Sequence, residues 1–161
     1  LTHGFDDEGS QFDGAGNLHN WWTPEVAKAF SARTGCVAAQ YDRFEISPGV
    51  TVNGKLTLGE NLADLGGMKL AYNSMKTYAG EAFGHKRASG FTPEQEFFIG
   101  YGQAWCLKAR DQYLMNMVRI DPHSFAKYRV IGPLSNMPEF QQAFSCPANA
   151  PMVRAERCSV W

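Results

Sequence analysis

Long apolar runs are missing from this sequence. A membrane-spanning helix needs about 20 consecutive, mostly apolar residues, and no stretch of the 161 residues approaches that length. A basic segment followed by an apolar one, typical of a secretory leader, is missing as well. We therefore expect no membrane contact from this segment, and an anchor or export signal would have to lie outside it.

An excess of charge of one sign is also missing. The chain has 15 Lys and Arg residues and 16 Asp and Glu residues, and its basic residues are scattered. Proteins that bind nucleic acid usually carry a basic patch or stripe, so nucleic acid is not expected as a partner. With 44% hydrophobic residues, the chain can bury one core but is too short for two sizeable ones. We expect residues 1–161 to form a single unit.

Cysteine is sparse and lacks the spacing of a metal site. The four cysteines, Cys36, Cys106, Cys146 and Cys158, include no C-x-x-C pair, which argues against a zinc ribbon and a thioredoxin-type redox site. Disulfides and free buried thiols both remain open as alternatives. Four cysteines allow three pairings, and the sequence alone does not choose among them.

Helix start signals are present at several points. The dipeptide Thr-Pro occurs at residues 23–24 and again at 92–93, and each pairs an N-cap residue with proline in the first helical turn. Thr57 precedes the longest helical pattern, about 58–78, and Glu60 three residues later is typical of a capping box. The prediction is a mainly α fold.

Strand signals are confined to residues 41–56. Polar and apolar residues alternate there, and the segment contains Pro48-Gly49 and Asn53-Gly54. Asn-Gly is a strong two-residue hairpin signal. We expect a loop or short hairpin with its tight turn at Asn53-Gly54, and short strands only.

Aromatic residues follow one helical stripe after the second Thr-Pro signal. Phe97, Phe98, Tyr101 and Trp105 fall at helical spacing, and such stripes usually face a core. We predict that all four are core residues and that Trp161 docks the end of the chain.

Two carboxylates in GENLADLGG have a spacing that suggests a site. Glu60 and Asp64 are four residues apart, which places both on one face of a helix. A solvated polar face is the simpler interpretation of this spacing. The surrounding residues are nearly all apolar or small, however, and buried carboxylates must be paired or bound to a metal ion. This environment favours a site.

His3 is a candidate metal ligand because of the acidic residues that follow it. Asp6 and Asp7 follow it closely, and an acid that accepts the second ring N–H orients a metal-bound imidazole. His3 and Glu60 together supply half of the ligand set of a zinc site built from two histidines and a glutamate.

Five blocks of the sequence then resemble one family, in order and over nearly the whole chain. They are LTHGFDDEGSQFDGAGNLHNWW, GENLADLGGMKLAY, FFIGYGQAWC, DPHSFAKYRVIGPLSN and the terminal CSVW. These are similar to signature blocks of the neprilysin family of zinc metallopeptidases, which includes endothelin-converting enzymes and bacterial oligopeptidases. The resemblance implies the C-terminal part of a thermolysin-like (gluzincin) catalytic domain. LTH matches the last three letters of the family's HExxH motif, so the first zinc histidine and the general-base glutamate are expected before Leu1.

The resemblance assigns a metal-binding group. His3 matches the second zinc histidine and Glu60 the third protein ligand of one Zn²⁺ ion. Asp64 matches the acid that orients a zinc histidine and raises its basicity.

It also assigns residues that would act on substrate. His123 matches the histidine that stabilises the oxyanion of the tetrahedral intermediate, and Asp121 is a candidate to hold that imidazole protonated. Arg129 matches the arginine that grips a substrate backbone carbonyl. Ser159 departs from the Cys-Arg-Val-Trp ending of many relatives, so recognition of a free carboxylate by that arginine is not expected.

The implied activity is hydrolysis of peptide bonds in oligopeptides by a zinc-activated water. Peptide substrates and the remainder of the same protein are the expected partners. With two of three zinc ligands and no general base, the isolated chain is predicted to bind zinc weakly and to be inactive. The alternative is a non-catalytic extracellular binding protein on a degenerate peptidase scaffold.

The resemblance finally addresses the cysteines. It implies a Cys36–Cys158 disulfide, and it matches Cys106 and Cys146 to cysteines whose partners lie upstream of this chain. Disulfides persist outside the reducing cytosol. We therefore expect an extracytoplasmic location, whether secreted, periplasmic or in a membrane-anchored ectodomain.

Overall fold

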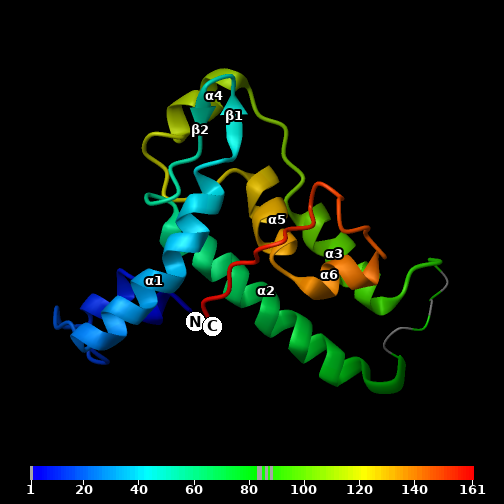
Figure 1. Ribbon diagram of the computed structural model, residues 1–161, viewed down its shortest axis with the longest axis horizontal. Helices are drawn as coiled ribbons and strands as arrows, with labels where there is room; N and C mark the ends of the chain where they lie inside the picture. Colours follow the sequence, from blue (N-terminus) through cyan, green and yellow to red (C-terminus); the bar gives the residue numbers. More distant parts are fainter. Residues whose placement is uncertain (1, 83–84, 86, 88) are drawn as a thin grey trace.

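A long central helix organises the protein, which we describe from a computed structural model. The structure describes residues 2–82, 85, 87 and 89–161. Helix α2 runs through the middle of the molecule and contacts η1, α1, α3 and α5 (Figure 1). Within the described residues, the one sheet has two short strands, so the predicted mainly α fold is confirmed. None of the described helices is both long and apolar enough to cross a bilayer.

Helices make up most of the elements along the chain. In order they are η1 Thr2–Phe5, η2 Gly9–Gln11, α1 Pro24–Tyr41, β1 Glu45–Ser47, β2 Val50–Thr51, α2 Leu58–Ala79, η3 Gly80–Ala82, α3 Pro93–Ala104, α4 Asp111–Met117, α5 Ala126–Ser135 and α6 Pro138–Ala143.

Two groups of buried apolar side chains share the central helix. The first joins α1, the start of α2, α5 and the C-terminal segment, and consists of Phe30, Val37, Tyr41, Val52, Leu62, Leu65, Tyr128, Cys158 and Val160. The second joins the middle of α2 to α3, the end of α5 and the residue before α6, and consists of Met68, Tyr72, Phe98, Leu134 and Met137. Removing these side chains from water supplies the main driving force for packing the helices around α2.

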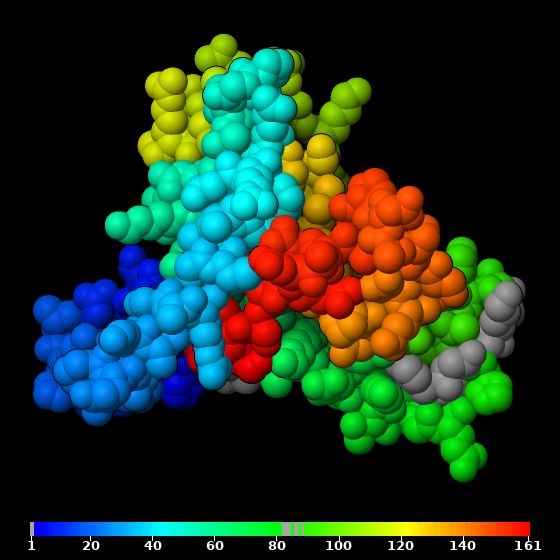
Figure 2. All heavy atoms as spheres, in the orientation of Figure 1, coloured from blue at the N-terminus to red at the C-terminus, as the bar shows by residue number. Residues whose placement is uncertain are grey.

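The C-terminal segment is fixed to α1 and α2. Cys36 and Cys158 form the implied disulfide, with their Cα atoms 5.6 Å apart. The Nη1 atom of Arg33 donates to the carbonyl of Val160 at 3.1 Å, and Nζ of Lys69 donates to Trp161 O at 2.8 Å. Figure 2 shows this segment, in red, on the surface between α1 and the region of α6.

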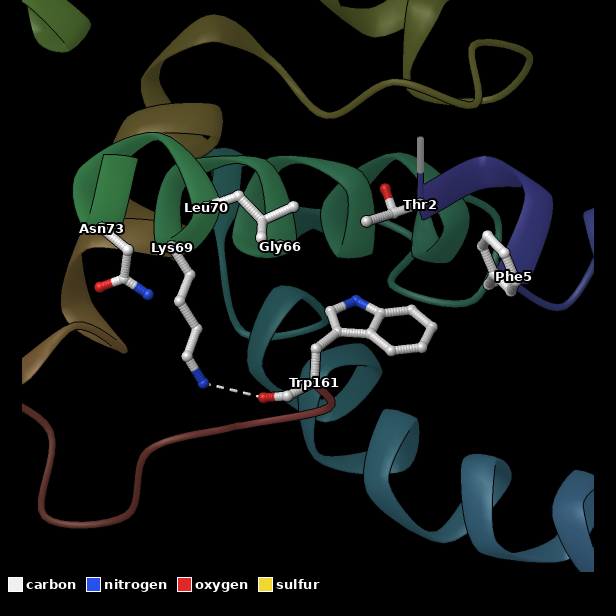
Figure 3. A pocket seen from close by; sticks show the side chains of 7 residues that line it. All are labelled: Thr2, Phe5, Gly66, Lys69, Leu70, Asn73 and Trp161. Atoms are coloured by element: carbon white, nitrogen blue, oxygen red, sulfur yellow. Dashed lines mark hydrogen bonds between the residues drawn. The ribbon is translucent and has the colours of Figure 1, made fainter. Parts of the chain in front are cut away.

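The two ends of the described chain meet beside Gly66. A side-chain carbon placed there would come within 2.9 Å of both Thr2 Cγ2 and Trp161 Cδ1. A mostly apolar cavity of about 460 Å³ opens next to this point, lined by Thr2, Phe5, Gly66, Lys69, Leu70, Asn73 and Trp161 (Figure 3). Trp161 thus docks the end of the chain, as predicted.

The hairpin turn lies elsewhere than predicted. The strands β1 and β2 are joined through Pro48-Gly49, where Gly49 has φ +75°. The predicted turn at Asn53-Gly54 is wrong. Gly54 is needed instead for a close approach, because a Cβ there would lie 2.1 Å from the carbonyl oxygen of Ala38.

Two of the three predicted helix caps are confirmed. The Thr23 hydroxyl accepts from the Val26 amide at 3.3 Å, and Thr92 forms a full capping box with Gln95. The capping box predicted at Thr57 is wrong, because the Thr57 hydroxyl makes no cap bond. That hydroxyl donates to the carbonyl of Asn53 at 3.0 Å instead.

The aromatic stripe is only partly a core. Phe98 is buried, and Phe97 and Tyr101 pack against the second apolar group. Trp105 ends α3 and is only partly buried, so its prediction as a core residue is wrong. Its ring lies against the guanidinium of Arg129, with Cζ 4.1 Å from the ring centroid.

Candidate functional site

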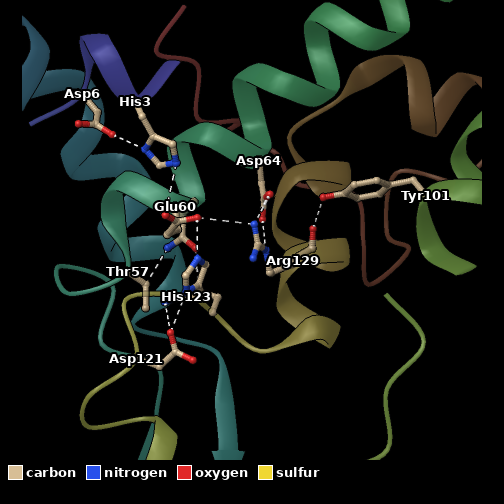
Figure 4. Close-up of polar contacts among 11 residues, drawn as sticks. His3, Asp6, Thr57, Glu60, Asp64, Tyr101, Asp121, His123 and Arg129 are labelled. Carbon is tan, nitrogen blue, oxygen red and sulfur yellow. Dashed lines mark hydrogen bonds and ion pairs between the residues drawn. The ribbon is translucent and has the colours of Figure 1, made fainter. Parts of the chain in front are cut away.

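Four segments bring charged and imidazole side chains together around Glu60 (Figure 4). Glu60 and Asp64 lie one turn apart on α2, as their spacing predicted. His3 comes from η1 and Arg129 from α5. His123 and Asp121 come from the loop between α4 and α5. The structure therefore brings all six residues singled out from the sequence into one cluster.

The carboxylate of Glu60 is the centre of this cluster. Its Oε1 lies 3.3 Å from His3 Nε2, and its Oε2 lies 3.2 Å from His123 Nε2. Arg129 Nη2 is 3.7 Å from the same Oε2. One carboxylate therefore faces two imidazoles and one guanidinium that come from three separate parts of the chain.

His3 is oriented by Asp6. His3 Nδ1 lies 2.8 Å from Asp6 Oδ2, so this nitrogen carries the hydrogen and donates it. The other oxygen of Asp6 accepts from the backbone amides of Glu8 and Gly9, at 3.0 and 2.8 Å. With its Nδ1 bound to Asp6, the imidazole directs Nε2 toward Glu60, and Nε2 is then the ring nitrogen available to a metal ion.

His123 has a similar arrangement with a different acid. Its Nδ1 lies 2.8 Å from Asp121 Oδ1, and its backbone amide donates to the same oxygen at 2.9 Å. Partial burial opposes ionisation of Asp121, but the hydrogen bonds from the His123 amide and ring outweigh it and lower the pKa of this carboxyl group. The imidazole is thereby aimed at Glu60 through Nε2.

Arg129 and Asp64 form a bidentate ion pair. Arg129 Nε donates to Asp64 Oδ2 at 2.7 Å, and Nη2 donates to Oδ1 at 2.8 Å. Burial raises the pKa of Asp64, and the hydrogen bonds from Arg129 offset this only in part. For Arg129, burial alone would lower the pKa, but the bonds to Asp64 raise it. Trp105 beneath the guanidinium and Tyr101, which donates to the Arg129 carbonyl at 2.7 Å, hold the arginine in place.

The donors around Glu60 fit part of a zinc site. Two ligands about 2.0–2.1 Å from a tetrahedral zinc ion are about 3.3 Å from each other, and His3 Nε2 and Glu60 Oε1 have this separation. One imidazole nitrogen and one carboxylate oxygen are also the ligand types that zinc takes. Among the described residues, no group of three His, Cys, Asp or Glu side chains is arranged to hold a metal ion. His3 and Glu60 could therefore supply two of the ligands of such a site.

Sequence reasoning missed three contacts of this site. The Asp64–Arg129 pair joins residues 65 positions apart, and the packing of Trp105 on Arg129 likewise crosses from α3 to α5. The choice of Asp6 over Asp7 as the partner of His3 was also left open. An Asp at the third position after His is compatible with one turn of 3₁₀ helix, which was a usable signal.

Comparisons with known proteins agree over the whole chain. Residues 1–160 match the family model described as Peptidase family M13. Neprilysin-11 of Caenorhabditis elegans is 44% identical over 165 residues, which cover 100% of this chain and 20% of that protein. The endothelin-converting enzyme homolog of Locusta migratoria is 42% identical over 163 residues, which cover 100% of this chain and 22% of that protein.

A solved structure gives the same result. Zinc metalloprotease ZMP1 of Mycobacterium tuberculosis, in complex with an inhibitor, superposes with a TM-score of 0.90 at 33% identity. The match covers 99% of this chain and 25% of that one. The chain thus spans only about a fifth of the length of the curated relatives it matches.

Proposed function

Because the chain belongs to peptidase family M13, we propose that it is the C-terminal part of the catalytic domain of a zinc-dependent metalloendopeptidase. Its relatives are about five times as long, so the activity belongs to the longer protein. The observation that carries the proposal is the convergence of His3, His123 and Arg129 on the carboxylate of Glu60.

His3 and Glu60 would hold the zinc ion together with a histidine from the remainder of the protein. Asp6 keeps Nε2 of His3 free for the metal by accepting the hydrogen of Nδ1. Asp64 would orient the remaining zinc histidine. When bound, the ion supplies Lewis-acid polarisation of the scissile carbonyl and a water of lowered pKa.

Two residues would stabilise charge on the substrate. His123 would donate from Nε2 to the oxyanion of the tetrahedral intermediate, and Asp121, bound to its Nδ1, would hold the ring in position. Arg129, already held by Asp64 and Trp105, would donate to a backbone carbonyl of a bound peptide. Donors fixed before the substrate arrives need little reorganisation, which is the main source of electrostatic catalysis.

The remainder of the protein would pack beside η1 and α2. Phe5 and Leu70 each leave 54% of their surface exposed, and both line the apolar cavity near Thr2. An exposed apolar hollow of this kind marks a surface that another part of a protein covers. We propose that the segment joined to Thr2 fills it and delivers the missing ligand and general base.

The proposed location is extracytoplasmic. The Cys36–Cys158 disulfide is formed, and such bonds persist in oxidising compartments. Cys106 and Cys146 are unpaired within the described residues, and we propose that their partners lie in the remainder of the protein.

The test compares the 161-residue chain with the longer protein from its gene. Zinc content and turnover of a fluorogenic oligopeptide are measured for both. We expect stoichiometric zinc and turnover only in the longer protein. Glu60→Gln should lower both by roughly 100-fold or more, whereas exposed Glu156→Gln should change neither. A longer protein that binds peptide without cleaving it, with or without Glu60, would support the non-catalytic alternative.

A further inference from the structure

The loop that carries His123 has one buried polar side chain. His123 leaves 47% of its side chain exposed, and its ring contacts Asp121 of the same loop and Glu60. Among residues 118–125, between α4 and α5, Ser124 is the one buried residue, and Phe125 next to it packs partly buried against the first apolar group. Ser124 therefore makes the buried polar contact that lies nearest to the imidazole along the chain.

Ser124 begins a directed chain of hydrogen bonds into α2. Its hydroxyl donates to Asn61 Oδ1 at 2.7 Å, and Asn61 Nδ2 donates to the Thr57 hydroxyl at 2.8 Å. The Thr57 hydroxyl in turn donates to the carbonyl of Asn53 at 3.0 Å. The side chains of Ser124, Asn61 and Thr57 are all buried, so each lost bond would leave an unsatisfied polar group.

The chemistry of this chain of bonds selects an amide at its centre. Asn61 must accept from Ser124 and donate to Thr57 at once, and an amide carries both an acceptor oxygen and donor hydrogens. A carboxylate in its place could accept from both hydroxyls but could not donate to Thr57. A leucine of similar size could do neither.

The buried Ser124–Asn61 contact is adjacent in sequence to the exposed His123–Glu60 contact, both in α2 and in the loop. Asn61 directly follows Glu60 on α2, and Ser124 directly follows His123 in the loop. Successive side chains on a helix point about 100° apart, so Glu60 faces the cluster while Asn61 faces the interior. The buried Ser124–Asn61 bond thus sets the register in which His123 meets Glu60.

We propose that Asn61 and Ser124 are positioning residues for His123: their hydrogen bond, with Asn61 itself held by the Thr57 hydroxyl, fixes Nε2 of His123 beside Glu60. This inference rests on the proposed function, because it gives His123 a task that depends on its position. Displacement of a group by about 1 Å can cost roughly 100-fold in rate. Free movement of the loop should therefore lower kcat more than it weakens substrate binding.

The test uses the zinc-loaded longer protein and a matched control. Ser124→Ala and Asn61→Leu should lower kcat by roughly 10-fold to 100-fold, with zinc content and KM little changed. Ser135→Ala is the control, because Ser135 and Ser124 are both 5% exposed. The Ser135 hydroxyl likewise makes buried hydrogen bonds, to Gly132 O and from Gln40. Ser135→Ala should lower the melting temperature to a similar extent and leave kcat unchanged, whereas equal kcat values in all three variants would overturn the inference.

A double-mutant cycle separates positioning from general stability. If Ser124 acts through His123, Ser124→Ala should have no further effect on kcat in a His123→Ala background. If Ser124→Ala lowered kcat by the same factor in the wild-type and His123→Ala backgrounds, Ser124 would act by another route, and the inference would be overturned.

A measurement without turnover keeps this inference distinct from the proposed function. Wild-type protein that fails to hydrolyse any peptide contradicts the proposed function alone. Carbethoxylation of His123 by diethylpyrocarbonate, mapped by mass spectrometry, still reports on its position. We expect the His123 rate to rise in Ser124→Ala and Asn61→Leu and to stay at the wild-type value in Ser135→Ala. Equal rates in all four proteins would overturn the inference.

Discussion

The two histidine segments reach the same carboxylate by different means. In each, Nδ1 is bound to an aspartate at 2.8 Å, and Nε2 faces one oxygen of Glu60. Asp6 on the His3 side is 3% exposed, whereas Asp121 on the His123 side is 26% exposed. The orienting acid is therefore part of the interior in one segment and part of the surface in the other.

This difference shows where each segment is anchored. Asp6 accepts two backbone amides besides the imidazole, so it both orients His3 and closes the turn around it. Among the described residues, Asp121 is hydrogen-bonded only to the amide and ring of His123, whereas buried Ser124 links that loop to α2. Damage to the acid should therefore cost fold stability on the His3 side and little on the His123 side.

The largest effect should come from Gly9→Ala. A Cβ at Gly9 would lie 1.7 Å from the carbonyl oxygen of His3, so the backbone of the turn would have to move. We expect a loss of about 3 kcal/mol in the free energy of unfolding, measured by urea denaturation. Gly4→Ala in the same segment is the control, because no atom lies within 4 Å of its Cβ position. Equal stability of the two variants would show that the turn around Asp6 is not fixed.

Asp6→Ala should have the next largest effect. It removes the acceptor of the His3 ring and of two backbone amides from a nearly fully buried position. Hydrogen bonds to a charged group contribute about 1.5–3 kcal/mol, and unsatisfied buried donors add a cost. We expect a loss of about 2–3 kcal/mol in the free energy of unfolding, with zinc affinity of the longer protein also reduced. A loss below about 1 kcal/mol would remove the proposed difference between the two segments.

Asp121→Ala should change stability much less. Its carboxylate is substantially exposed, and exposed ion pairs contribute at most about 1 kcal/mol. We expect a free energy of unfolding within about 1 kcal/mol of the wild type, together with a lower kcat in the longer protein. A loss as large as that of Asp6→Ala would mean that the His123 loop is anchored by its acid after all.

The smallest effect is a dependence of the Asp121 contribution on pH. The pKa of this group is lowered in the folded protein, so its stabilising effect is present above its unfolded pKa of about 3.9. The effect is lost as the pH falls through the lower folded value. The stability difference between wild type and Asp121→Asn should therefore be present at about pH 5 and shrink below about pH 4. A difference that persists unchanged at pH 2 would contradict this assignment.

Local signals predicted much of the fold. The Thr-Pro dipeptides at residues 23–24 and 92–93 mark the starts of α1 and α3, because both side-chain caps form within four residues. The hairpin turn could not be chosen in the same way. Pro48-Gly49 and Asn53-Gly54 are both turn signals, and only the tertiary contact of Gly54 with α1 distinguishes them.

The sequence predicted which residues form the candidate site, but not which of them pair with each other. Glu60 and Asp64 share a helix face by spacing alone, whereas Arg129 reaches Asp64 only because α5 packs on α2. Thr57 carries the signal of a capping residue, but its hydroxyl is used by Asn61 and Asn53. Both bonds span four residues, so one local hydrogen-bond pattern replaces another at Thr57. The tertiary bond that no local pattern encodes is the one from Ser124 to Asn61.

The disulfide between Cys36 and Cys158 has a consequence for the order of folding. It joins residues 122 positions apart, and Cys158 and Val160 belong to the same apolar group as Phe30 and Val37. Ribosomes add roughly 5–20 residues per second, so α1 emerges on the order of ten seconds before its covalent partner. During that interval α1 and α2 expose the apolar surface that Cys158 and Val160 later cover. Synthesis of residues 158–160 and oxidation of the cysteines, rather than local helix formation, should therefore complete this half of the fold, and chaperones have their main opportunity to bind before that point.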